Sequence, residues 1–322
     1  MLNLSKNKYP MKVSIVIVTY NRWTELRNTI NAYLNQTYKN IEIIVLDNAS
    51  TDETADKFIK EFPMVKYIYL PENFEIKAAN IGMYMASGEV IWRSDDDSHP
   101  LKNNCIEQVV NILEKHKNID IISTEIILPN SNNHIIDWYP FKINKNNVPE
   151  EGFISNYFMG GGVAIRKKVF DTIGGFWGFG HEEIDFSTRA ILANFTIRYF
   201  PNIISVHNVA MNNRDSAWRW IQMSKQHIRY QFKYFRFLRA SYRAFIVAIT
   251  KILQGIYQKR NPIIMFECIV AMFYSGLTTL INEHKPIKDK QKLYEITLNS
   301  SILKSEFKYI KTSIKTKFKK NK

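Results

Sequence analysis

The sequence is poor in cysteine, glycine and proline. Its 322 residues include two cysteines, 12 glycines and 10 prolines. The two cysteines, Cys105 and Cys268, cannot form a disulfide framework, and no Cys or His cluster has zinc-ligand spacing, which favours a reducing compartment. With 45% apolar and 23% charged residues, the composition indicates a globular protein and excludes fibrous and disordered classes. The length suits one large domain with an appendage, or two modest domains.

The N-terminal region lacks the pattern of a secretory signal. The first apolar run, residues 13–18, is six residues long and leads into Thr19, Tyr20 and Asn21, where a signal peptide would have small residues. We interpret this run as a β-strand and expect a cytoplasmic protein.

Acidic residues are scarce in the last third of the chain. Residues 1–209 contain 21 Lys and Arg against 24 Asp and Glu, whereas residues 210–322 contain 23 against 6. The excess behind the net charge of +14 therefore lies after residue 209. This asymmetry indicates a region that meets an anionic surface, either membrane lipid or nucleic acid.

The first two hundred residues alternate between strand and helix patterns. Strand-like runs cover residues 13–19, 41–47, 66–70 and 90–94. Helical patterns lie between them, and Ser50–Glu53 has the sequence of a capping box that would start a helix. The alternation predicts an α/β fold, with a Rossmann-like, mostly parallel sheet and helices on both faces. Ligands of such sheets bind beyond the carboxyl ends of the strands, where Thr19, Asp47 and Asp95 lie.

The pattern changes near residue 210, where we place a domain boundary. Residues 217–245 mix aromatic and basic side chains with helical character, and residues 263–281 contain a single charge, Glu267. We expect residues 1–210 to form the α/β domain and residues 211–322 to form a helical, basic, membrane-associating region. The alternatives are a membrane-spanning helix, an ordinary helical extension and nucleic-acid binding. No nucleic-acid partner is expected, because no nucleic-acid motif is recognisable.

The strongest local signal for chemistry is the triplet Asp95-Asp96-Asp97. Three adjacent carboxylates at the end of a strand repel one another unless a cation lies among them. A hard divalent ion with oxygen ligands, which also binds phosphates, removes this repulsion. The alternative is a solvated acidic turn.

Seven motifs follow one another along residues 12–208. They are residues 13–21 (VSIVIVTYN), 43–52 (IIVLDNASTD), the segment from Asn73 to Gly88, the Asp95–Asp97 triplet, 160–166 (GGGVAIR), 173–176 (IGGF) and 182–189 (EEIDFSTR). In this order they resemble the large inverting family of glycosyltransferases with the GT-A fold, family 2. The resemblance implies an enzyme that transfers a sugar from a UDP- or dTDP-sugar to an acceptor hydroxyl in polysaccharide or glycolipid biosynthesis of the cell envelope.

The resemblance also assigns roles to individual residues. The donor nucleotide would be bound by Thr19, Tyr20, Asn21, Asp47, Asn48, Ser50, Lys77, Asn80, Asp95 and Asp96. Asp95 and Asp97 match the D-x-D motif that holds the ribose and a diphosphate-bound Mg²⁺ or Mn²⁺. His207 matches a histidine that, in several relatives, completes the set of groups around the metal or the diphosphate. Other interpretations stay open: Asp47 as a helix cap, Asn21 as a turn residue and His207 as a structural histidine.

Inverting transfer requires a carboxylate that takes the proton of the acceptor hydroxyl. In the family this base is the second acidic residue of an E-D pair, which matches Glu183, a Glu in place of the usual Asp. Glu182 remains a candidate, and either carboxylate can also stabilise a helix N-terminus. Asp185 and Arg189, four residues apart, can pair on one helix face.

Further candidates would contact the donor or acceptor sugar. They are Gly161, Gly162, Trp177 and Asp185. The glycines permit close backbone approach, a role that the resemblance implies, and a plain flexible loop is the alternative. The aromatic ring of Trp177 can stack on a sugar or pack in a core.

Rival functions remain at this point. A transferase that makes a polyprenyl-phosphate sugar shares these motifs, and a non-catalytic protein that binds sugar nucleotides is a second rival. A dinucleotide-dependent oxidoreductase is disfavoured, because no G-x-G-x-x-G follows the first strand. The expected partners are a nucleotide-sugar donor, a glycan or lipid-linked acceptor and an anionic membrane, with the protein peripheral on its inner face.

Overall fold

The computed structural model describes residues 11–128, 134–135, 143–208 and 216–297. The chain divides into two units, which we describe separately. The first consists of Met1–Trp177 and Glu183–Ala210, and the second of Gly178–Glu182 and Met211–Lys322. The Lys-rich end of the chain, after Thr297, lies outside the described residues. A separate membrane-associating domain over residues 211–322 stays a prediction.

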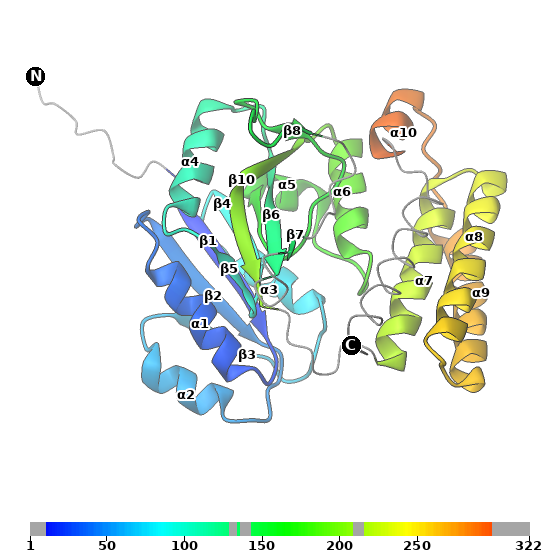
Figure 1. The fold of residues 1–322 in the computed structure, drawn as a ribbon, viewed down its shortest axis with the longest axis horizontal. Helices are drawn as coiled ribbons and strands as arrows, with labels where there is room; N and C mark the ends of the chain where they lie inside the picture. The colour runs from blue at the N-terminus through cyan, green and yellow to red at the C-terminus, as the bar shows by residue number, and fades with distance from the viewer. Residues whose placement is uncertain (1–10, 129–133, 136–142, 209–215, 298–322) are drawn as a thin grey trace, which may run out of the picture. The chain divides into compact units, whose positions relative to one another are not determined.

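A central sheet organises the first unit (Figure 1). Its strands follow the order β3-β2-β1-β4-β9-β6-β10-β5, with β7 paired to β6 and β8 paired to β10. The strands are β1 Val13–Thr19, β2 Ile41–Asp47, β3 Lys66–Tyr69, β4 Val90–Asp95, β5 Ser98–Pro100, β6 Ile121–Leu128, β7 His134–Ile135, β8 Phe153–Ile154, β9 Val163–Arg166 and β10 Ile197–His207.

The first four strands form the parallel half of this sheet. β3, β2, β1 and β4 lie side by side and run in one direction. β1 is apolar on both faces, and Ile15, Val16 and Ile17 are all fully buried. A strand in the middle of a parallel sheet is covered on both faces, which explains its nearly continuous run of β-branched residues.

The complete sheet contains antiparallel pairs as well, but its longest paired stretches are parallel, as predicted. β9 lies between β4 and β6 and is antiparallel to both, and β5 is antiparallel to β10. β6 and β10 are again parallel. The periodicity of a segment indicates that it is a strand, but its direction depends on which distant strand it pairs with. The predicted α/β class is confirmed.

Helices cover both faces of the sheet, as predicted. The helices of the first unit are α1 Trp23–Leu34, α2 Thr54–Glu61, α3 Lys77–Met85, α4 Cys105–Lys115, α5 Lys167–Ile173 and α6 Glu182–Leu192. Side chains of α1, α2 and α4 join one buried apolar cluster with the sheet. α3 covers the opposite face, where a Cβ atom at Gly82 would lie 2.4 Å from Leu46 and 2.6 Å from Val16. Gly82 therefore allows α3 to pack closely on β1 and β2.

The predicted capping box at Ser50–Glu53 is wrong. α2 begins at Thr54, and its N-cap residue Glu53 makes no side-chain capping bond. The Thr54 N–H instead donates to Asp52 Oδ1 at 3.0 Å. The Ser50 hydroxyl accepts the N–H of Asn21 at 2.8 Å. Ser50 thus bonds to the loop after β1, a partner that a local motif does not reveal.

The described part of the second unit is helical. Its helices are α7 Ala217–Tyr234, α8 Phe237–Tyr257, α9 Pro262–Asn282 and α10 Lys290–Thr297. α7, α8 and α9 share an apolar cluster that includes Ile228, Val247 and Met272. The predicted helical run 217–245 is interrupted at Phe235 and Arg236, whose ψ angles of 150° and 147° are extended.

α9 has clear local start signals. Asn261 Oδ1 accepts the N–H of Ile263 at 2.8 Å, and Pro262 occupies the first turn, where its missing N–H costs nothing. Among the described residues, α9 is the one helix that is long and apolar enough to cross a membrane by length and composition.

Candidate active site

Polar residues end three neighbouring strands at one edge of the sheet. In the parallel register, Thr19 at the end of β1 pairs with Asp47 at the end of β2, and Val18 pairs with Asp95 at the end of β4. Parallel strands bring their carboxyl ends to the same edge, where open α/β sheets bind ligands. The sequence-based prediction of a shared edge is confirmed.

Asp47 anchors the turn that follows β2. Its Oδ1 atom accepts the N–H of Ser50 at 2.7 Å, and Tyr67 donates its hydroxyl to Oδ2. Burial and the neighbouring Asp47 carboxylate raise the pKa of Tyr67 well above its ordinary value, so the phenol remains a donor. α2 begins seven residues after Asp47, so the alternative of a helix cap is wrong for this residue.

Asn21 connects the loops that follow β1 and β2. Its φ of 52° lies in the left-handed region, which Asn tolerates better than most residues. Its side-chain oxygen accepts the N–H of Thr51 at 2.7 Å. The turn role considered for Asn21 is therefore present, and it brings the two loops together.

Two further residues predicted to bind nucleotide hold neighbouring loops through their amides. Asn48 donates to Asn73 at 2.8 Å and accepts the N–H of Phe74 at 2.8 Å. Asn80 donates to the carbonyl of Phe176 at 3.0 Å and accepts its N–H at 2.8 Å. Both residues shape the edge of the site. Tyr20 and Lys77, which we also predicted to contact the nucleotide, are exposed.

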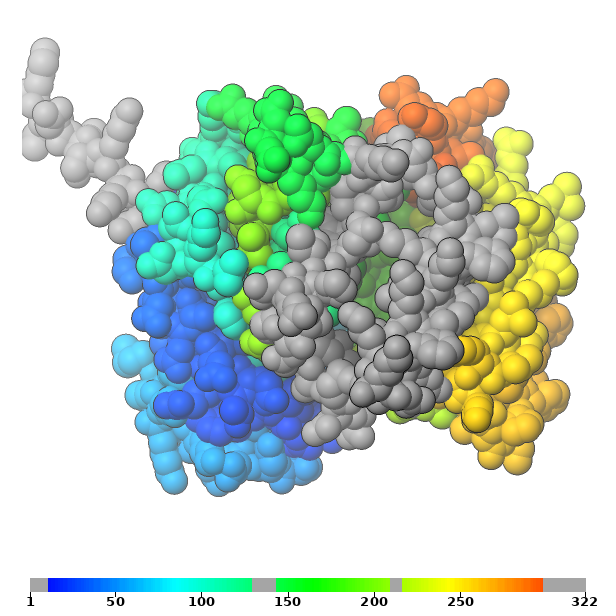
Figure 2. All heavy atoms as spheres, in the orientation of Figure 1, coloured from blue at the N-terminus to red at the C-terminus, as the bar shows by residue number. Residues whose placement is uncertain are grey.

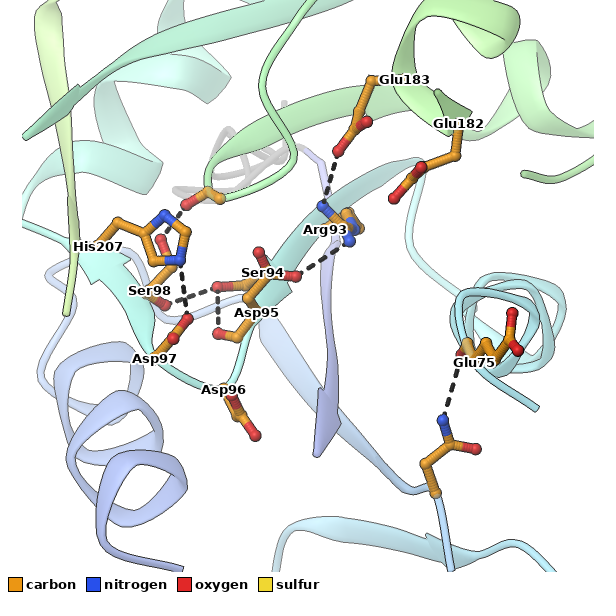
Figure 3. Close-up of polar contacts among 12 residues, drawn as sticks. Glu75, Arg93, Ser94, Asp95, Asp96, Asp97, Ser98, Glu182, Glu183 and His207 are labelled. Carbon is orange, nitrogen blue, oxygen red and sulfur yellow. Dashed lines mark hydrogen bonds and ion pairs between the residues drawn. The ribbon is translucent and has the colours of Figure 1, made fainter. Parts of the chain in front are cut away.

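A carboxylate–imidazole group lies at the end of β4 (Figure 3). Asp95, Asp97 and His207 each offer one possible ligand atom, a carboxylate oxygen or an imidazole nitrogen. These three atoms lie within 4.8 Å of one another. His207 Nε2 lies 3.0 Å from Asp97 Oδ1. His207 ends β10, and the antiparallel pairing of β10 with β5 brings it opposite Ser98. The three residues predicted to hold a metal are thus brought together.

This donor set fits a divalent cation. Two carboxylates and one imidazole are ligands that Mn²⁺ accepts, and carboxylates suit Mg²⁺. The Asp97 side chain is almost fully buried and that of Asp95 is 35% exposed, so one ligand is enclosed and the other is open to a substrate. The interpretation of this segment as a solvated acidic turn is wrong, because Asp96 and Asp97 are buried.

Asp96 faces away from this group (Figure 3). It accepts the Thr19 hydroxyl at 3.0 Å and an Nη1 bond from Arg22 at 2.9 Å. Burial raises the pKa of Asp96 to about 7, although Arg22 acts in the opposite direction. Arg22 also contacts Asp97 at 3.0 Å. Arg22 was not among the predicted residues, and its only signal in the sequence is its position directly after Asn21.

Arg93 is a second cation that was not among the predicted residues. Its Nη2 atom lies 3.0 Å from Asp95 Oδ1, and its Nη1 atom lies 3.8 Å from Glu183 Oε1. Its guanidinium carbon lies 5.7 Å from the centre of the Phe176 ring. A signal was available: Arg93 interrupts an apolar strand two residues before Asp95, and side chains two apart share one face of a strand.

Gly160 makes room for this arginine. A Cβ atom at Gly160 would lie 1.6 Å from Arg93 Nη1 and 2.6 Å from Glu183 Oε1. Any side chain at this position would displace one of the two groups. The Arg93–Glu183 contact therefore depends on a glycine in a loop that lies between the two residues in the sequence.

The two candidate bases have different surroundings. Glu182 is the first residue of α6, and its carboxylate accepts the N–H of Gly180. This bond joins the start of α6 to the residues that precede it. Glu183 faces Arg93, and a quarter of its side chain is exposed.

The glycines before β9 are packed closely. The carbonyl of Gly161 accepts the Ser98 hydroxyl, and the carbonyl of Gly162 accepts the Thr124 hydroxyl at 2.7 Å. A Cβ atom at Gly162 would lie 2.1 Å from Ser205 Oγ. Both glycines are therefore held by contacts with neighbouring strands.

The remaining two candidates differ in exposure. Asp185 is buried and pairs with Arg189 at 2.8 Å, as predicted for residues on one helix face. Arg189 also donates to the carbonyls of Ile173 and Gly175, which ties α6 to the end of α5. Trp177 is half-exposed, so its ring is accessible.

Comparison with known proteins identifies the family. The model described as glycosyl transferase family 2 matches residues 14–174, half of the chain. The chain belongs to glycosyl transferase family 2. Two proteins described as uncharacterized glycosyltransferases, from Rickettsia typhi and Rickettsia prowazekii, are each 38% identical to this family 2 chain over 120 residues. That match covers 37% of this chain and 37% of each relative, so the chain spans little more than a third of their length.

Solved structures share the fold of this family 2 chain. The mannosyltransferase PcManGT from Pyrobaculum calidifontis, in complex with GDP-Man and Mn²⁺, has a TM-score of 0.53 at 14% identity, over 91% of this chain and 88% of that one. GalNAc-T7 with UDP, GalNAc and Mn²⁺ has a TM-score of 0.60 at 19% identity, over 75% of this chain and 51% of that one. The predicted GT-A fold is confirmed.

Two candidate site residues of the family 2 chain lie beyond its matched region. Glu183 and His207 both follow residue 174, where the family match ends. β10 brings His207 beside Asp97, and α6 brings Glu183 beside Arg93. The geometry of the site therefore extends past the segment that identifies the family.

Proposed function

We propose that this chain transfers a sugar from a nucleoside-diphosphate donor to an acceptor hydroxyl, with inversion at the anomeric carbon. The observation that carries the proposal is the Asp95–Asp97–His207 group, which Arg93 connects to the Glu183 carboxylate. Membership of family 2 supports the transferase class. A ligand set for a divalent ion with a further carboxylate close by is the arrangement that this reaction needs.

The donor is proposed to be a UDP- or dTDP-sugar. The solved relatives with UDP or GDP-Man support a nucleotide-sugar donor, and both contain Mn²⁺. Asp95, Asp97 and His207 would hold Mg²⁺ or Mn²⁺ against the diphosphate, and the bound ion would supply charge neutralisation on the leaving group. Asp47 and Asn21, which shape the loops after β1 and β2, would contact the nucleoside.

Glu183 is proposed as the base. Its carboxylate takes the proton of the acceptor hydroxyl while the acceptor oxygen forms a bond to the anomeric carbon. The bond from that carbon to the diphosphate oxygen breaks in the same step, and the nucleoside diphosphate leaves with its electron pair. Arg93 holds Glu183 from one side, which limits the positions that its longer side chain can reach. Glu182 is less suited, because its carboxylate bonds to Gly180.

The acceptor is proposed to be a hydroxyl of a glycan or lipid-linked sugar in polysaccharide or glycolipid synthesis of the cell envelope. Trp177, with its accessible ring, is the residue best suited to stack on a sugar. The proposed location is the cytoplasm, at the inner face of the membrane.

A ligand screen followed by a turnover assay tests this function. Ligands that bind the folded state raise its melting temperature, so a nucleotide sugar should raise it with Mn²⁺ present and much less with EDTA. The same donor should release its nucleoside diphosphate slowly by hydrolysis, and EDTA should stop this release. A nucleotide sugar that raises the melting temperature but releases no nucleoside diphosphate, whether or not sugar and lipid acceptors are added, would indicate a non-catalytic binding protein.

The choice of acceptor separates the proposal from its enzymatic rival. A phosphate acceptor is already ionised and needs no base, so a polyprenyl-phosphate transferase would keep its turnover when Glu183 is replaced by Gln. A hydroxyl acceptor requires the carboxylate. Retained turnover of Glu183→Gln on a polyprenyl phosphate would therefore contradict the proposed acceptor class.

A further inference from the structure

The outward side of α8 is apolar along the whole helix. Six exposed residues recur at spacings of three and four, which places them on one stripe of the helix. They are Leu238, Tyr242, Phe245, Ile249, Leu253 and Ile256. The opposite side of α8 contributes Ile246 and Val247 to the buried cluster. α8 is therefore apolar on the side that packs inward and also on the side that faces outward.

α9 has the same organisation. Its exposed stripe consists of Ile263, Phe266, Val270, Phe273, Leu277 and Ile281, and Ile269 and Tyr274 widen it. Its buried side includes Cys268, Met272, Ser275 and Thr279. The more polar residues of α9 thus pack inward and the more apolar ones face outward, the reverse of a helix on the surface of a soluble protein.

The two stripes lie on surfaces that the neighbouring helices leave uncovered. α7 packs against both α8 and α9 through a shared apolar cluster, and a Cβ atom at Gly255 of α8 would lie 3.2 Å from Met265 of α9. Atoms of α8 and α9, drawn in yellow, are visible at the molecular surface in Figure 2. An exposed apolar surface of this length on a protein is a binding surface. We call these two stripes the α8–α9 face.

Positive charge surrounds this face at both ends of the helices. Between Phe237 and Asn282 the sequence contains one acidic residue, Glu267. Arg239, near the start of α8, and Lys259, in the turn that leads to α9, are exposed. Arg243 and Arg260 instead lie over the rings of Phe235 and Trp220. Cations that border an apolar surface match the anionic headgroups that border the hydrocarbon of a bilayer.

We propose that the α8–α9 face binds an anionic lipid bilayer, with both helices lying in the plane of the membrane surface. The apolar stripes enter the boundary between headgroups and acyl chains, and the basic residues at the helix ends contact lipid phosphates. Tyr242 and Tyr274 lie at the level of the headgroups, which suits a ring with a polar tip. The proposal is independent of the sugar-transfer reaction, because lipid binding and turnover are measured separately.

The contacts of α9 with α7 favour lying in the surface over spanning. The Ser275 hydroxyl donates to the carbonyl of Lys225 at 3.0 Å, and the N–H of Lys285 donates to the carbonyl of Lys233 at 2.9 Å. Arg229 pairs with Glu283, just past the end of α9, at 3.0 Å. A spanning α9 would have to leave these partners or draw the basic residues of α7 into hydrocarbon, which is costly.

The charge distribution also favours lipid over a second copy of the chain. Two α8–α9 faces packed together would bring the basic helix ends of both copies close to one another. Like charges at such an interface repel, whereas anionic headgroups attract the same residues. A bilayer therefore satisfies both the apolar stripes and their cationic borders.

Vesicle flotation of the full chain tests the surface. We expect binding to vesicles of phosphatidylcholine with 30% phosphatidylglycerol to exceed binding to pure phosphatidylcholine by about tenfold or more. The double variant Ile263→Gln with Ile281→Gln should bind the anionic vesicles at least about tenfold more weakly, because both side chains leave the lipid. Circular dichroism verifies that each variant is folded.

A matched control uses equally exposed isoleucines in the first unit. Ile59 and Ile154 are 62% and 60% exposed, against 66% for Ile263 and 71% for Ile281. Ile59→Gln with Ile154→Gln should leave lipid binding unchanged. Equal binding by the wild type and both variants would overturn the proposal. So would a wild-type dimer that the Ile263/Ile281 variant converts to monomer while neither protein binds lipid.

Thiol labelling of bound protein tests whether α9 lies in the surface. Gln258→Cys and Asn282→Cys introduce thiols on either side of α9, and the native Cys105 and Cys268 are buried. A membrane-impermeant maleimide added outside sealed vesicles should label both introduced thiols to the same extent. Labelling of one thiol and protection of the other until detergent is added would show a span and overturn the in-plane arrangement.

Discussion

The Nη1 atom of Arg93 lies 3.8 Å from Oε1 of Glu183, although 90 residues separate them in sequence. The same guanidinium contacts Asp95 at 3.0 Å, so one side chain touches the proposed metal group and the proposed base. Arg93 is almost fully enclosed, which strengthens both interactions relative to water. A change at Arg93 should therefore affect catalysis through position as well as charge.

Replacement of Arg93 by Met should lower kcat by about tenfold or more. The substitution removes the cation that holds Glu183 and Asp95 but keeps a long apolar chain in the buried space. Steady-state kinetics measure the effect. Arg27→Met is the control, because Arg27 forms an exposed surface pair with Glu61 and should keep wild-type turnover. Equal kcat values for Arg93→Met and the wild type would contradict the positioning role.

Gly160→Ala should reproduce much of the Arg93 defect. The added Cβ atom would lie 1.6 Å from Arg93 Nη1, so the guanidinium has to move. The double variant Gly160→Ala with Arg93→Met should have a kcat only slightly lower than that of the more impaired single variant. Both substitutions remove the same contact, that between Arg93 and Glu183, so their effects on kcat should not add. A double-mutant cycle of kcat values gives this coupling. Fully additive losses would show that Gly160 acts in another way.

Replacement of Asp97 or His207 should abolish the response to metal. Asp97→Asn replaces a charged carboxylate ligand by a neutral amide, and His207→Ala removes the imidazole ligand. The rise in melting temperature with Mn²⁺ and donor should therefore disappear together with turnover. Differential scanning fluorimetry and the release of nucleoside diphosphate measure the two effects. Asp171→Asn, at an exposed pair with Lys167, is the control. A normal Mn²⁺ response in Asp97→Asn would place the metal elsewhere.

Glu183→Gln should lower kcat about 10²- to 10⁴-fold and leave donor binding intact. An amide keeps the size of the side chain but accepts no proton from the acceptor. Isothermal titration of donor with Mn²⁺ measures binding, and coupled release of nucleoside diphosphate measures kcat. Glu182→Gln serves as the comparison, since Glu182 bonds to Gly180 and should keep most of its turnover. The opposite ranking of the two variants would make Glu182 the base.

The stability of the sheet should depend on the ionised form of Glu42. Burial raises the pKa of this carboxyl, but hydrogen bonds from Ser14 and Ser87 outweigh burial and lower the pKa to about 2. The unfolded chain binds its proton at about pH 4.5, so ionised Glu42 stabilises the fold above that pH. This stabilisation is lost as the pH falls towards 2.

Replacement of Glu42 by Gln measures this contribution. The free energy of unfolding should fall by about 1–2 kcal/mol at pH 7. The difference from the wild type should shrink between pH 5 and pH 3. Urea unfolding at several pH values measures both. Glu53→Gln, at an exposed pair with Lys57, should change stability by less than about 0.5 kcal/mol. A pH-independent difference for Glu42→Gln would contradict the assignment.

Local periodicity was sufficient to predict the strands and several site residues. Residues 13–19 and 41–47 are strands with the predicted bounds, because continuous β-branched runs are stable only in a covered sheet. Asp95 and Asp97 were found because adjacent carboxylates at a strand end are costly without a cation. His207 was found through the family resemblance, and the structure brings it to Asp97.

Contacts between distant segments account for the errors. The capping box failed because Ser50 bonds to Asn21, and the interruption between α7 and α8 has no Gly or Pro to mark it. Arg22 pairs with Asp97, 75 residues later in the sequence, and Arg93 contacts Glu183, 90 residues later. No pattern within ten or twenty residues contains such information.

The sequence by itself determined the class of the fold, the strands that end in polar residues and the family, because these follow from local periodicity and short motifs. The tertiary structure decided the direction of β9, the partners of Arg93 and the inward or outward side of each residue in α8 and α9. The physical reason is that burial, charge pairing and strand direction are properties of contacts between segments. A residue acquires them only when the chain folds.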